Sequence, residues 1–288
     1  MEIDTLVLSG GGINCISLLG SFKYLFENGT IHPNFKNIRT IICVSGSAFH
    51  IIPLLLNYSI NMVIQLFLSY NEEIINYDNF DLNKLLINFG LYKNNFIQEM
   101  IEKLLEKKNL NQRMTLQELF EMTNIDLIIK VENISQNKIV YINHKSHPKI
   151  PLSVVCSMTT CIPFLFQPIN YKNDLYIDGG ICGNLPLDYI QNKSKYKKYL
   201  AINILVKSKE EILSIQDFLF ALFVIPFSPL DHTINKKKVI TIRMDEIGIQ
   251  LNINKEKKIQ KYNEGYKQTW IYFNGHKHID SKHRSNED

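Results

Sequence analysis

Apolar positions along the first 60 residues follow strand-like and helix-like spacing in turn. A short apolar run at 3–8 predicts a strand, and the run Ser9-Gly-Gly-Gly12 after it predicts a loop. Apolar residues then recur at helical spacing over about 14–26, which predicts a helix. A second strand at 38–44 and a second helix at 47–56 repeat this order. Strands that alternate with helices in this way predict an α/β fold with a parallel sheet.

The pattern continues to the end of the chain without a break that would divide it. Helical spacing and a Thr115–Glu118 capping box indicate helices in the middle of the chain. The later predicted elements are strands at 126–132, 138–143, 198–205 and 238–244 and a final helix at about 255–273. Because no Pro/Gly/Ser-rich linker is present, we predict one domain at 1–275, with a helical insertion around 58–125 and a polar tail at 276–288.

Composition supports a globular protein with a sizeable core. The chain has 288 residues, of which 45% are hydrophobic and 21% charged. A net charge of +4 is too small for a nucleic-acid footprint, so no nucleic acid is expected as a partner. The five cysteines lack metal-ligand spacing and are interpreted as small buried thiols in a reducing compartment. They are Cys15, Cys43, Cys156, Cys161 and Cys182.

No segment predicts a membrane span. Residues 40–71 contain no Asp, Glu, Lys or Arg, but polar residues and a proline interrupt them well short of the ~20 apolar residues a span needs. Acidic Glu2 and Asp4 differ from the basic start of a signal peptide, so a cytoplasmic protein with peripheral membrane contact is expected. The apolar run 218–227 is either a core helix or an interfacial anchor, with Lys236–Lys238 near anionic headgroups in the second case.

Two pieces near the N-terminus could carry chemistry. Ser45 lies in Cys43-Val-Ser-Gly-Ser47, where a strand turns into a helix, so its hydroxyl is either a nucleophile held on the bend or a helix cap. Ser47 could serve as the cap as well. The run Gly10-Gly-Gly12 is either a tight turn or a set of backbone N–H groups that can stabilise an oxyanion. The spacing of phosphate or dinucleotide loops is absent.

A third piece is Asp178, which lies between an apolar strand and Gly179-Gly180. It is either a turn residue or the base that a serine nucleophile requires. Among the histidines only His50 lies near Ser45, about one helical turn away, and packing is its expected role. The others are His32, His144, His147, His232, His276, His278 and His283. A carboxylate is therefore the expected base, and burial of Asp178 would raise its proton affinity.

These pieces resemble, in order and spacing, the motifs of the patatin-like phospholipase family in the versions found in large DNA viruses. The resemblance is carried by Leu8–Cys15, Val44–Ser47 and Asp178–Gly180, with Thr160–Pro168 and Gly248–Asn254 as further landmarks. It implies a three-layer fold with a central, mostly parallel sheet flanked by helices. The chain departs from the family where Asn14 and Cys15 replace an Arg-Gly pair, and where Cys43 and Ser47 replace the elbow glycines.

The resemblance implies a phospholipase A-type lipid acyl hydrolase. Ser45 would be the nucleophile and Asp178 its base, with the backbone of Gly10, Gly11, Gly12 and Ile13 as oxyanion hole. Gly46, Ser47, Gly179 and Gly180 would support the two catalytic residues. A phospholipid or membrane surface would be the substrate, with no metal or other cofactor. Alternatives are a catalytically degenerate lipid- or protein-binding member, or an esterase of lysophospholipids or neutral lipids; protein partners stay unknown.

Overall fold

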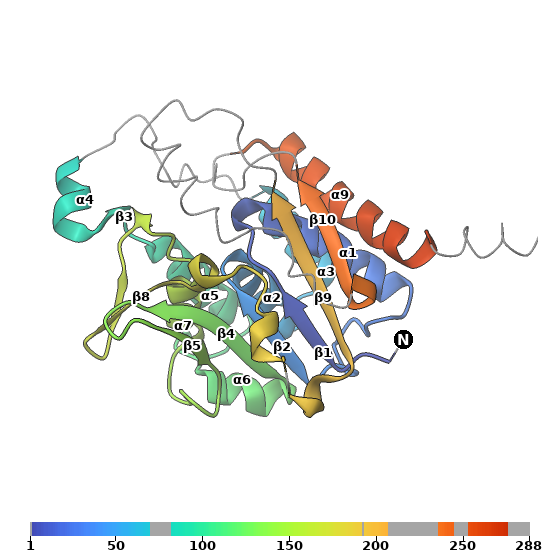
Figure 1. Ribbon diagram of the computed structural model, residues 1–288, viewed down its shortest axis with the longest axis horizontal. Coiled ribbons are helices and arrows are strands. Elements are labelled where there is room, and N and C mark those ends of the chain that lie inside the picture. Colours follow the sequence, from blue (N-terminus) through green and yellow to red (C-terminus); the bar gives the residue numbers. More distant parts are fainter. Residues whose placement is uncertain (1, 70–81, 192, 207–235, 245–252, 276–288) are drawn as a thin grey trace, which may run out of the picture.

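The computed structural model describes residues 2–69, 82–191, 193–206, 236–244 and 253–275 (Figure 1). The apolar run 218–227, most of the landmark 248–254 and the predicted tail 276–288 lie outside the described residues. So do His232, His276, His278 and His283.

A twisted sheet in the order β10-β9-β1-β2-β4-β8-β7 forms the centre of the protein. The first five strands in this order are parallel, whereas β8 and β7 continue the sheet antiparallel and β5 pairs antiparallel with β4. The strands are β1 (Thr5–Leu8), β2 (Thr40–Val44), β4 (Asp126–Asn133), β5 (Lys138–Ile142), β7 (Ile169–Tyr171), β8 (Asp174–Asp178), β9 (Tyr199–Val206) and β10 (Val239–Met244).

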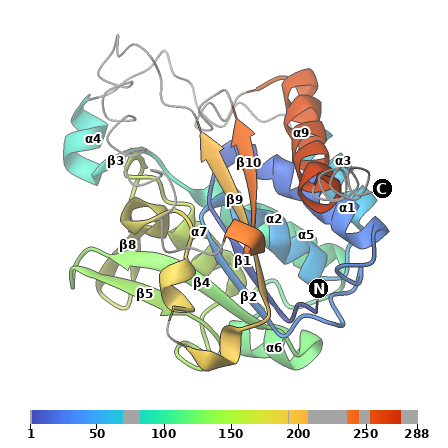
Figure 2. The same ribbon diagram turned by 45° about the vertical axis from the view of Figure 1, so that its right-hand side comes forward.

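Helices cover one face of this sheet, and short 3-10 turns cover the other (Figure 2). The helices are α1 (Ile16–Glu27), α2 (Gly46–Leu55), α3 (Ile60–Ser69), α4 (Leu82–Asn88), α5 (Asn95–Lys107), α6 (Leu116–Thr123), α7 (Leu152–Thr159) and α9 (Lys255–Asn274). The turns on the opposite face include η3 (Leu187–Tyr189) and η4 (Ser194–Tyr196). The predicted three-layer arrangement is confirmed.

Alternation along the strands explains why both faces are covered. In β2, Ile41 and Cys43 join the large core beneath the helices, while Ile42 joins the smaller core on the other face. Leu6 and Val7 divide in the same way in β1. A parallel strand buried on both faces reads as a continuous apolar run, which is the pattern seen in the sequence.

Helix α9 closes the fold against α1, side by side with it in both ribbon views. Glycines make this close approach possible, since a Cβ on Gly265 would lie 1.9 Å from the carbonyl oxygen of Ser17. A Cβ on Gly20 would lie 2.0 Å from the carbonyl oxygen of Tyr262. The predicted helix at 255–273 is therefore confirmed, and its contact is with α1.

The sequence pattern missed a second, two-stranded sheet. Strand β3 (Gly90–Tyr92) pairs in parallel with β6 (Phe164–Phe166). Gly90 is paired with Phe164, which lies 74 residues later in the sequence. Three-residue strands are too short to show a periodicity, so the segment around 90 was expected to be helical. The predicted capping box is confirmed, because Thr115 accepts from the Glu118 N–H and Glu118 accepts from the Thr115 N–H.

Candidate active site

Ser45 occupies a strained bend between β2 and α2. Its backbone lies at φ 58° and ψ −137°, a conformation that L residues rarely adopt. By position Ser45 is the N-cap residue of α2, yet its side chain makes no capping hydrogen bond. Its N–H donates instead to Thr159 Oγ1 at 2.7 Å, which fixes the bend from outside. The hydroxyl is therefore available for another partner.

That partner is Asp178, at the end of β8. Ser45 Oγ donates to Asp178 Oδ2 at 2.5 Å, across 133 residues of sequence. The second carboxylate oxygen, Oδ1, accepts from the Gly180 N–H at 2.8 Å. Both side chains are buried, with 4% of Ser45 and none of Asp178 exposed. Such an arrangement can supply a nucleophile and an adjacent base that is held by a third group.

Burial raises the pKa of Asp178 from 3.8 to about 7. The hydrogen bonds from Ser45 and Gly180 and the positive charge of Lys130 act against this rise, because each stabilises the carboxylate. A carboxyl group with a pKa near neutrality can take a proton from a hydroxyl and return it within one catalytic cycle.

His50 is not oriented toward Ser45. Its Nδ1 is 2.7 Å from the Gly46 carbonyl oxygen of its own helix, and its ring stacks on Phe67 with centroids 4.0 Å apart. Burial lowers the pKa of His50 to about 4, so the imidazole is neutral and Nδ1 carries the donated proton. The expectation that His50 packs is confirmed.

The glycine loop, residues 10–12, lies directly against the elbow, which is the bend at Ser45 between β2 and α2. A Cβ on Gly46 would lie 2.7 Å from the Gly12 carbonyl oxygen, so only glycine allows this approach. Gly10, which was predicted to offer its N–H to an oxyanion, instead donates to the Asn184 carbonyl at 3.2 Å. That prediction is wrong for Gly10, because its N–H is already engaged. Gly11, Gly12 and Ile13 stay as predicted donors.

The supporting residues hold the two turns in place. Ser47 does not cap α2, as had been considered; its Oγ donates to the Val44 carbonyl at 2.7 Å and accepts from the Val44 N–H at 3.1 Å. Cys43 is fully buried in the large core. A Cβ on Gly179 would lie 2.6 Å from the Lys130 carbonyl oxygen, so this motif glycine is required by packing.

Three residues that sequence reasoning did not select complete the site. Thr159 Oγ1 accepts from the Ser45 N–H and donates to the Lys130 carbonyl at 2.7 Å. The Lys130 ammonium is buried and donates to the carbonyls of Cys182 and Gly183 at 2.8 and 2.9 Å. Asn184 Nδ2 donates to the Gly10 carbonyl at 3.0 Å. A lysine within the apolar strand run Leu127–Val131 was the one visible signal of this network.

The cysteine prediction is correct in part. All five thiols are free, and four of them are buried. Cys182 is exposed, because it lies on the turn after Asp178 rather than in the core. Within the described residues there is no cluster of three metal-ligating side chains. None of the described helices combines the length and apolar composition needed to cross a bilayer.

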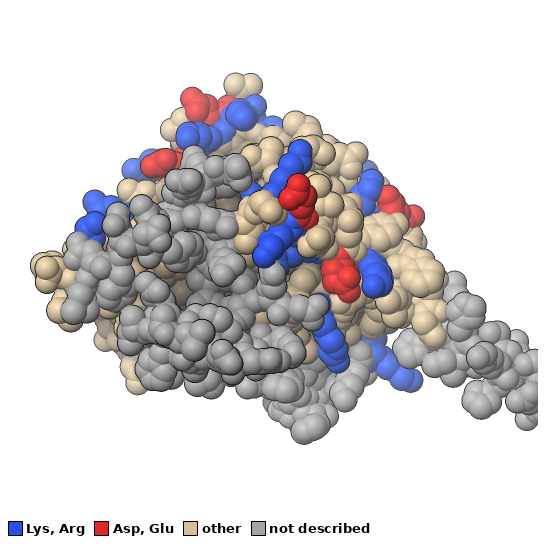
Figure 3. Space-filling view, turned by 90° about the horizontal axis from the view of Figure 1, so that it is seen from above, with Lys and Arg blue, Asp and Glu red and all other residues tan. Residues whose placement is uncertain are grey.

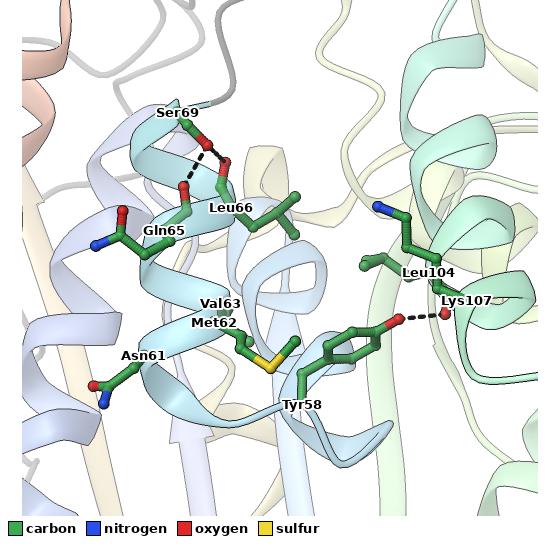
Figure 4. Close-up of a pocket in the computed structure, with 9 residues that line it drawn as sticks. All are labelled: Tyr58, Asn61, Met62, Val63, Gln65, Leu66, Ser69, Leu104 and Lys107. Atoms are coloured by element: carbon green, nitrogen blue, oxygen red, sulfur yellow. Dashed lines mark hydrogen bonds between the residues drawn. The ribbon is translucent and has the colours of Figure 1, made fainter.

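A separate pocket of about 480 Å³ opens between α3 and α5 (Figure 4). Its lining is largely apolar and includes Met62, Leu66 and Leu104. Tyr58 lies on its floor and donates to the Leu104 carbonyl at 2.7 Å. None of its lining residues belongs to the site around Ser45.

Comparisons with known proteins show which sequences and folds this chain is similar to. A family model described as patatin-like phospholipase matches residues 6–190, more than half of the chain. The probable lipid hydrolase of Invertebrate iridescent virus 6 is 29% identical over 198 residues, covering 67% of this chain and 66% of that protein. An uncharacterized protein of Acanthamoeba polyphaga mimivirus is 28% identical over 187 residues, covering 65% of this chain and 61% of that protein. The matched region thus spans slightly less than two thirds of each viral relative.

Among solved structures, the crystal structure of VipD from Legionella pneumophila is similar to the protein. The TM-score is 0.64 at 18% sequence identity, with 96% of this chain and 67% of that chain covered. At this identity the similarity shows the fold alone.

Proposed function

The chain belongs to the patatin-like phospholipase family, and from this premise we propose that it is a lipid acyl hydrolase that cleaves fatty acyl esters of glycerophospholipids through Ser45 and Asp178. The observation that carries the proposal is the 2.5 Å hydrogen bond between Ser45 Oγ and Asp178 Oδ2. The similarity to a viral protein named probable lipid hydrolase supports the choice of a lipid ester.

In the first half-reaction Ser45 Oγ attacks the carbonyl carbon of the ester and its proton passes to Asp178 Oδ2. The tetrahedral intermediate then expels the lysophospholipid alkoxide, which takes the proton from Asp178, and an acyl-enzyme forms on Ser45. In the second half-reaction water attacks the acyl carbon while Asp178 accepts its proton. Ser45 leaves, is reprotonated by Asp178, and the fatty acid is released.

The oxyanion of each tetrahedral intermediate needs preorganised donors. The glycine loop at Gly11, Gly12 and Ile13 contacts the elbow and is the proposed source of these N–H groups. The N-terminus of α2, which begins at Gly46 directly after Ser45, adds a favourable dipole at the same point.

Fatty-acid release from phosphatidylcholine vesicles by wild type, Ser45→Ala and Asp178→Asn tests the proposal. We expect release by wild type and none above background by Ser45→Ala. A fluorophosphonate probe should label wild type and leave Ser45→Ala unlabelled. Undiminished release by Ser45→Ala would sink the assignment, and a wild type without labelling or release would indicate a catalytically degenerate, binding member.

A comparison of lipid classes tests the substrate. Release from phosphatidylcholine, lysophosphatidylcholine and triacylglycerol should be measured at equal enzyme concentration. We expect the highest kcat/KM with the diacyl phospholipid. A preference for the lyso form or for triacylglycerol would leave the proposed roles of Ser45 and Asp178 unchanged, but it would contradict the proposed substrate class.

A further inference from the structure

Two phenylalanine side chains project into solvent from neighbouring positions on the small β3–β6 sheet. Phe89, directly before β3, is 63% exposed, and Phe164, the first residue of β6, is 46% exposed. They are neighbours in space, since Gly90 is in register with Phe164. Leu86 and Ile87, in the last turn of α4, are 66% and 74% exposed. We call these four residues the apolar rim.

The backbone at both phenylalanines is unfavourable as well. Phe89 has φ 58° and Phe164 has φ 66°, in the left-handed region where Gly and Asn are favoured and a bulky residue costs about 1–2 kcal/mol. A stability argument would therefore select a small or polar residue at each position. Exposed aromatic rings held at strained positions point instead to a contact that the isolated chain does not make.

The apolar rim is tied to the candidate active site by short connections. A Cβ on Gly90 would lie 2.4 Å from the Phe166 carbonyl carbon, so the two strands are in close contact. Phe164 follows Cys161 by three residues, which span at most about 11 Å of chain. The Cys161 carbonyl accepts from the Asp178 N–H at 2.9 Å. The rim and Asp178 therefore belong to one connected part of the fold.

Charge near the rim is compatible with a lipid surface. Residues 82–93 contain Lys84 and Lys93 and no Asp or Glu. On the described surface that is visible from above, Lys and Arg side chains are mixed with a smaller number of Asp and Glu side chains (Figure 3). Insertion of apolar side chains, rather than attraction of opposite charges, is therefore the dominant interaction to consider.

We propose that Leu86, Ile87, Phe89 and Phe164 insert into the headgroup and acyl boundary of a phospholipid bilayer and hold the protein on its surface. The occupant is the bilayer because Phe164 follows Cys161, whose carbonyl accepts from Asp178, by three residues, and the proposed substrate of the Ser45–Asp178 pair is a bilayer component. This inference rests on the proposed function for its choice of ligand. Its test does not depend on catalysis.

The test measures binding of the Ser45→Ala variant to phosphatidylcholine vesicles in a sedimentation assay. The vesicles are used with and without phosphatidylserine at about one fifth of the lipid. The double substitution Phe89→Asn and Phe164→Asn is introduced in this background. Asn tolerates the left-handed backbone, so the thermal midpoint should be equal or higher. We expect vesicle binding to weaken at least about tenfold in both lipid mixtures, because two large apolar side chains are lost from the interface.

Two control variants make the result specific. Met122→Asn removes a side chain of 44% exposure on α6, which lies at the lower edge of Figure 1, and should leave binding unchanged. Trp270→Ser removes the exposed indole of α9, a competing aromatic side chain on another part of the surface. If binding follows Trp270 and not the two phenylalanines, or if it is unchanged in the double variant, the proposal is overturned. Absence of any vesicle binding before substitution overturns it as well and favours a protein partner for the rim.

Hydrolysis assays separate this inference from the proposed function. With Ser45 intact, the double variant should lose release from vesicles but hydrolyse a soluble short-chain nitrophenyl ester like the wild type. Equal loss on both substrates overturns the surface role and indicates damage to the site. If the wild type hydrolyses neither substrate, the proposed function is wrong. The vesicle-binding result still shows whether the apolar rim binds a bilayer.

Discussion

Helix α2 with His50 and the end of strand β8 with Asp178 offer two candidate bases of opposite character. His50 is one helical turn from Ser45 in sequence, and Asp178 is 133 residues away. Yet the carboxylate receives the Ser45 hydrogen bond, while the imidazole bonds to its own helix and stacks on Phe67. Sheet topology brings β8 next to β4 and so decides which group faces Ser45.

Burial shifts the pKa values of the two groups in opposite directions, because it disfavours the charged form of each. It raises the pKa of Asp178 to about 7 and lowers the pKa of His50 to about 4. Three groups stabilise the charged form of Asp178, namely Ser45, the Gly180 N–H and the Lys130 charge, whereas the charged form of His50 is stabilised by the Gly46 carbonyl alone. The difference teaches that a base is recognised by what supports its charge, not by its distance along the chain.

The largest expected effect comes from exchanging each candidate base for a neutral residue. Asp178→Asn should lower kcat roughly 10²- to 10⁴-fold, since an amide cannot accept the Ser45 proton. His50→Asn retains an amide N–H where Nδ1 donates to Gly46, and should change kcat less than about threefold. Initial rates of fatty-acid release at pH 8 measure both. A large loss with His50→Asn and a small one with Asp178→Asn would reverse the comparison.

The pH dependence of the reaction tests the role of Lys130. Asp178 must be a carboxylate to accept a proton, so kcat/KM should rise with pH through about 7. The buried ammonium lowers the pKa of Asp178, so Lys130→Met should raise that pKa and move the rising limb to higher pH. At pH 6 the variant should be roughly tenfold slower than wild type, and the gap should narrow at pH 9.

Lys130→Arg is the matched control, because it keeps the charge beside the Cys182 and Gly183 carbonyls. Its rising limb should stay near that of wild type. If the Lys130→Met profile is lower than that of wild type by the same factor at every pH, Lys130 has a packing role only and does not set the pKa of Asp178.

A smaller effect is expected from the residue that holds the elbow. Thr159→Val leaves the Ser45 N–H and the Lys130 carbonyl without their buried partner, at a cost of about 1–3 kcal/mol in unfolding free energy for each orphaned group. We expect a lower urea midpoint and a kcat reduced about tenfold. Thr123→Val removes a hydroxyl that likewise joins a backbone N–H to a backbone carbonyl, on α6. It should lower stability and leave kcat unchanged.

Much of the fold and the Ser45–Asp178 pairing could be predicted from the sequence for local reasons. Strands β1 and β2, which are buried on both faces, are almost continuous apolar runs, and glycine occupies turn positions where a Cβ has no room, as at Gly46 and Gly179. The motif residues are therefore visible without the structure. Their roles in catalysis stay predictions until the variants are measured.

The residues that escaped prediction act through contacts between distant parts of the chain. Thr159 reaches Ser45 across 114 residues, and Asn184 reaches Gly10 across 174. No periodicity encodes such pairs. The engagement of the Gly10 N–H by Asn184, and the parallel pairing of β3 with β6, follow from how separate loops meet and have no local signature.

The smallest effect concerns stability toward acid, where the two buried groups oppose each other. Unfolded His50 binds a proton near 6.5 but the folded residue only near 4, so its contribution to stability is lost as pH falls through this window, at most about 3 kcal/mol. Asp178 keeps its proton up to about 7 in the folded state and only to 3.8 when unfolded, so its contribution grows as pH falls between these values. His50→Asn, compared with wild type by urea unfolding between pH 7 and 4, should therefore gain relative stability as the solution is acidified, and Asp178→Asn should lose it. Parallel curves for wild type and both variants would contradict the opposed shifts on which the comparison rests.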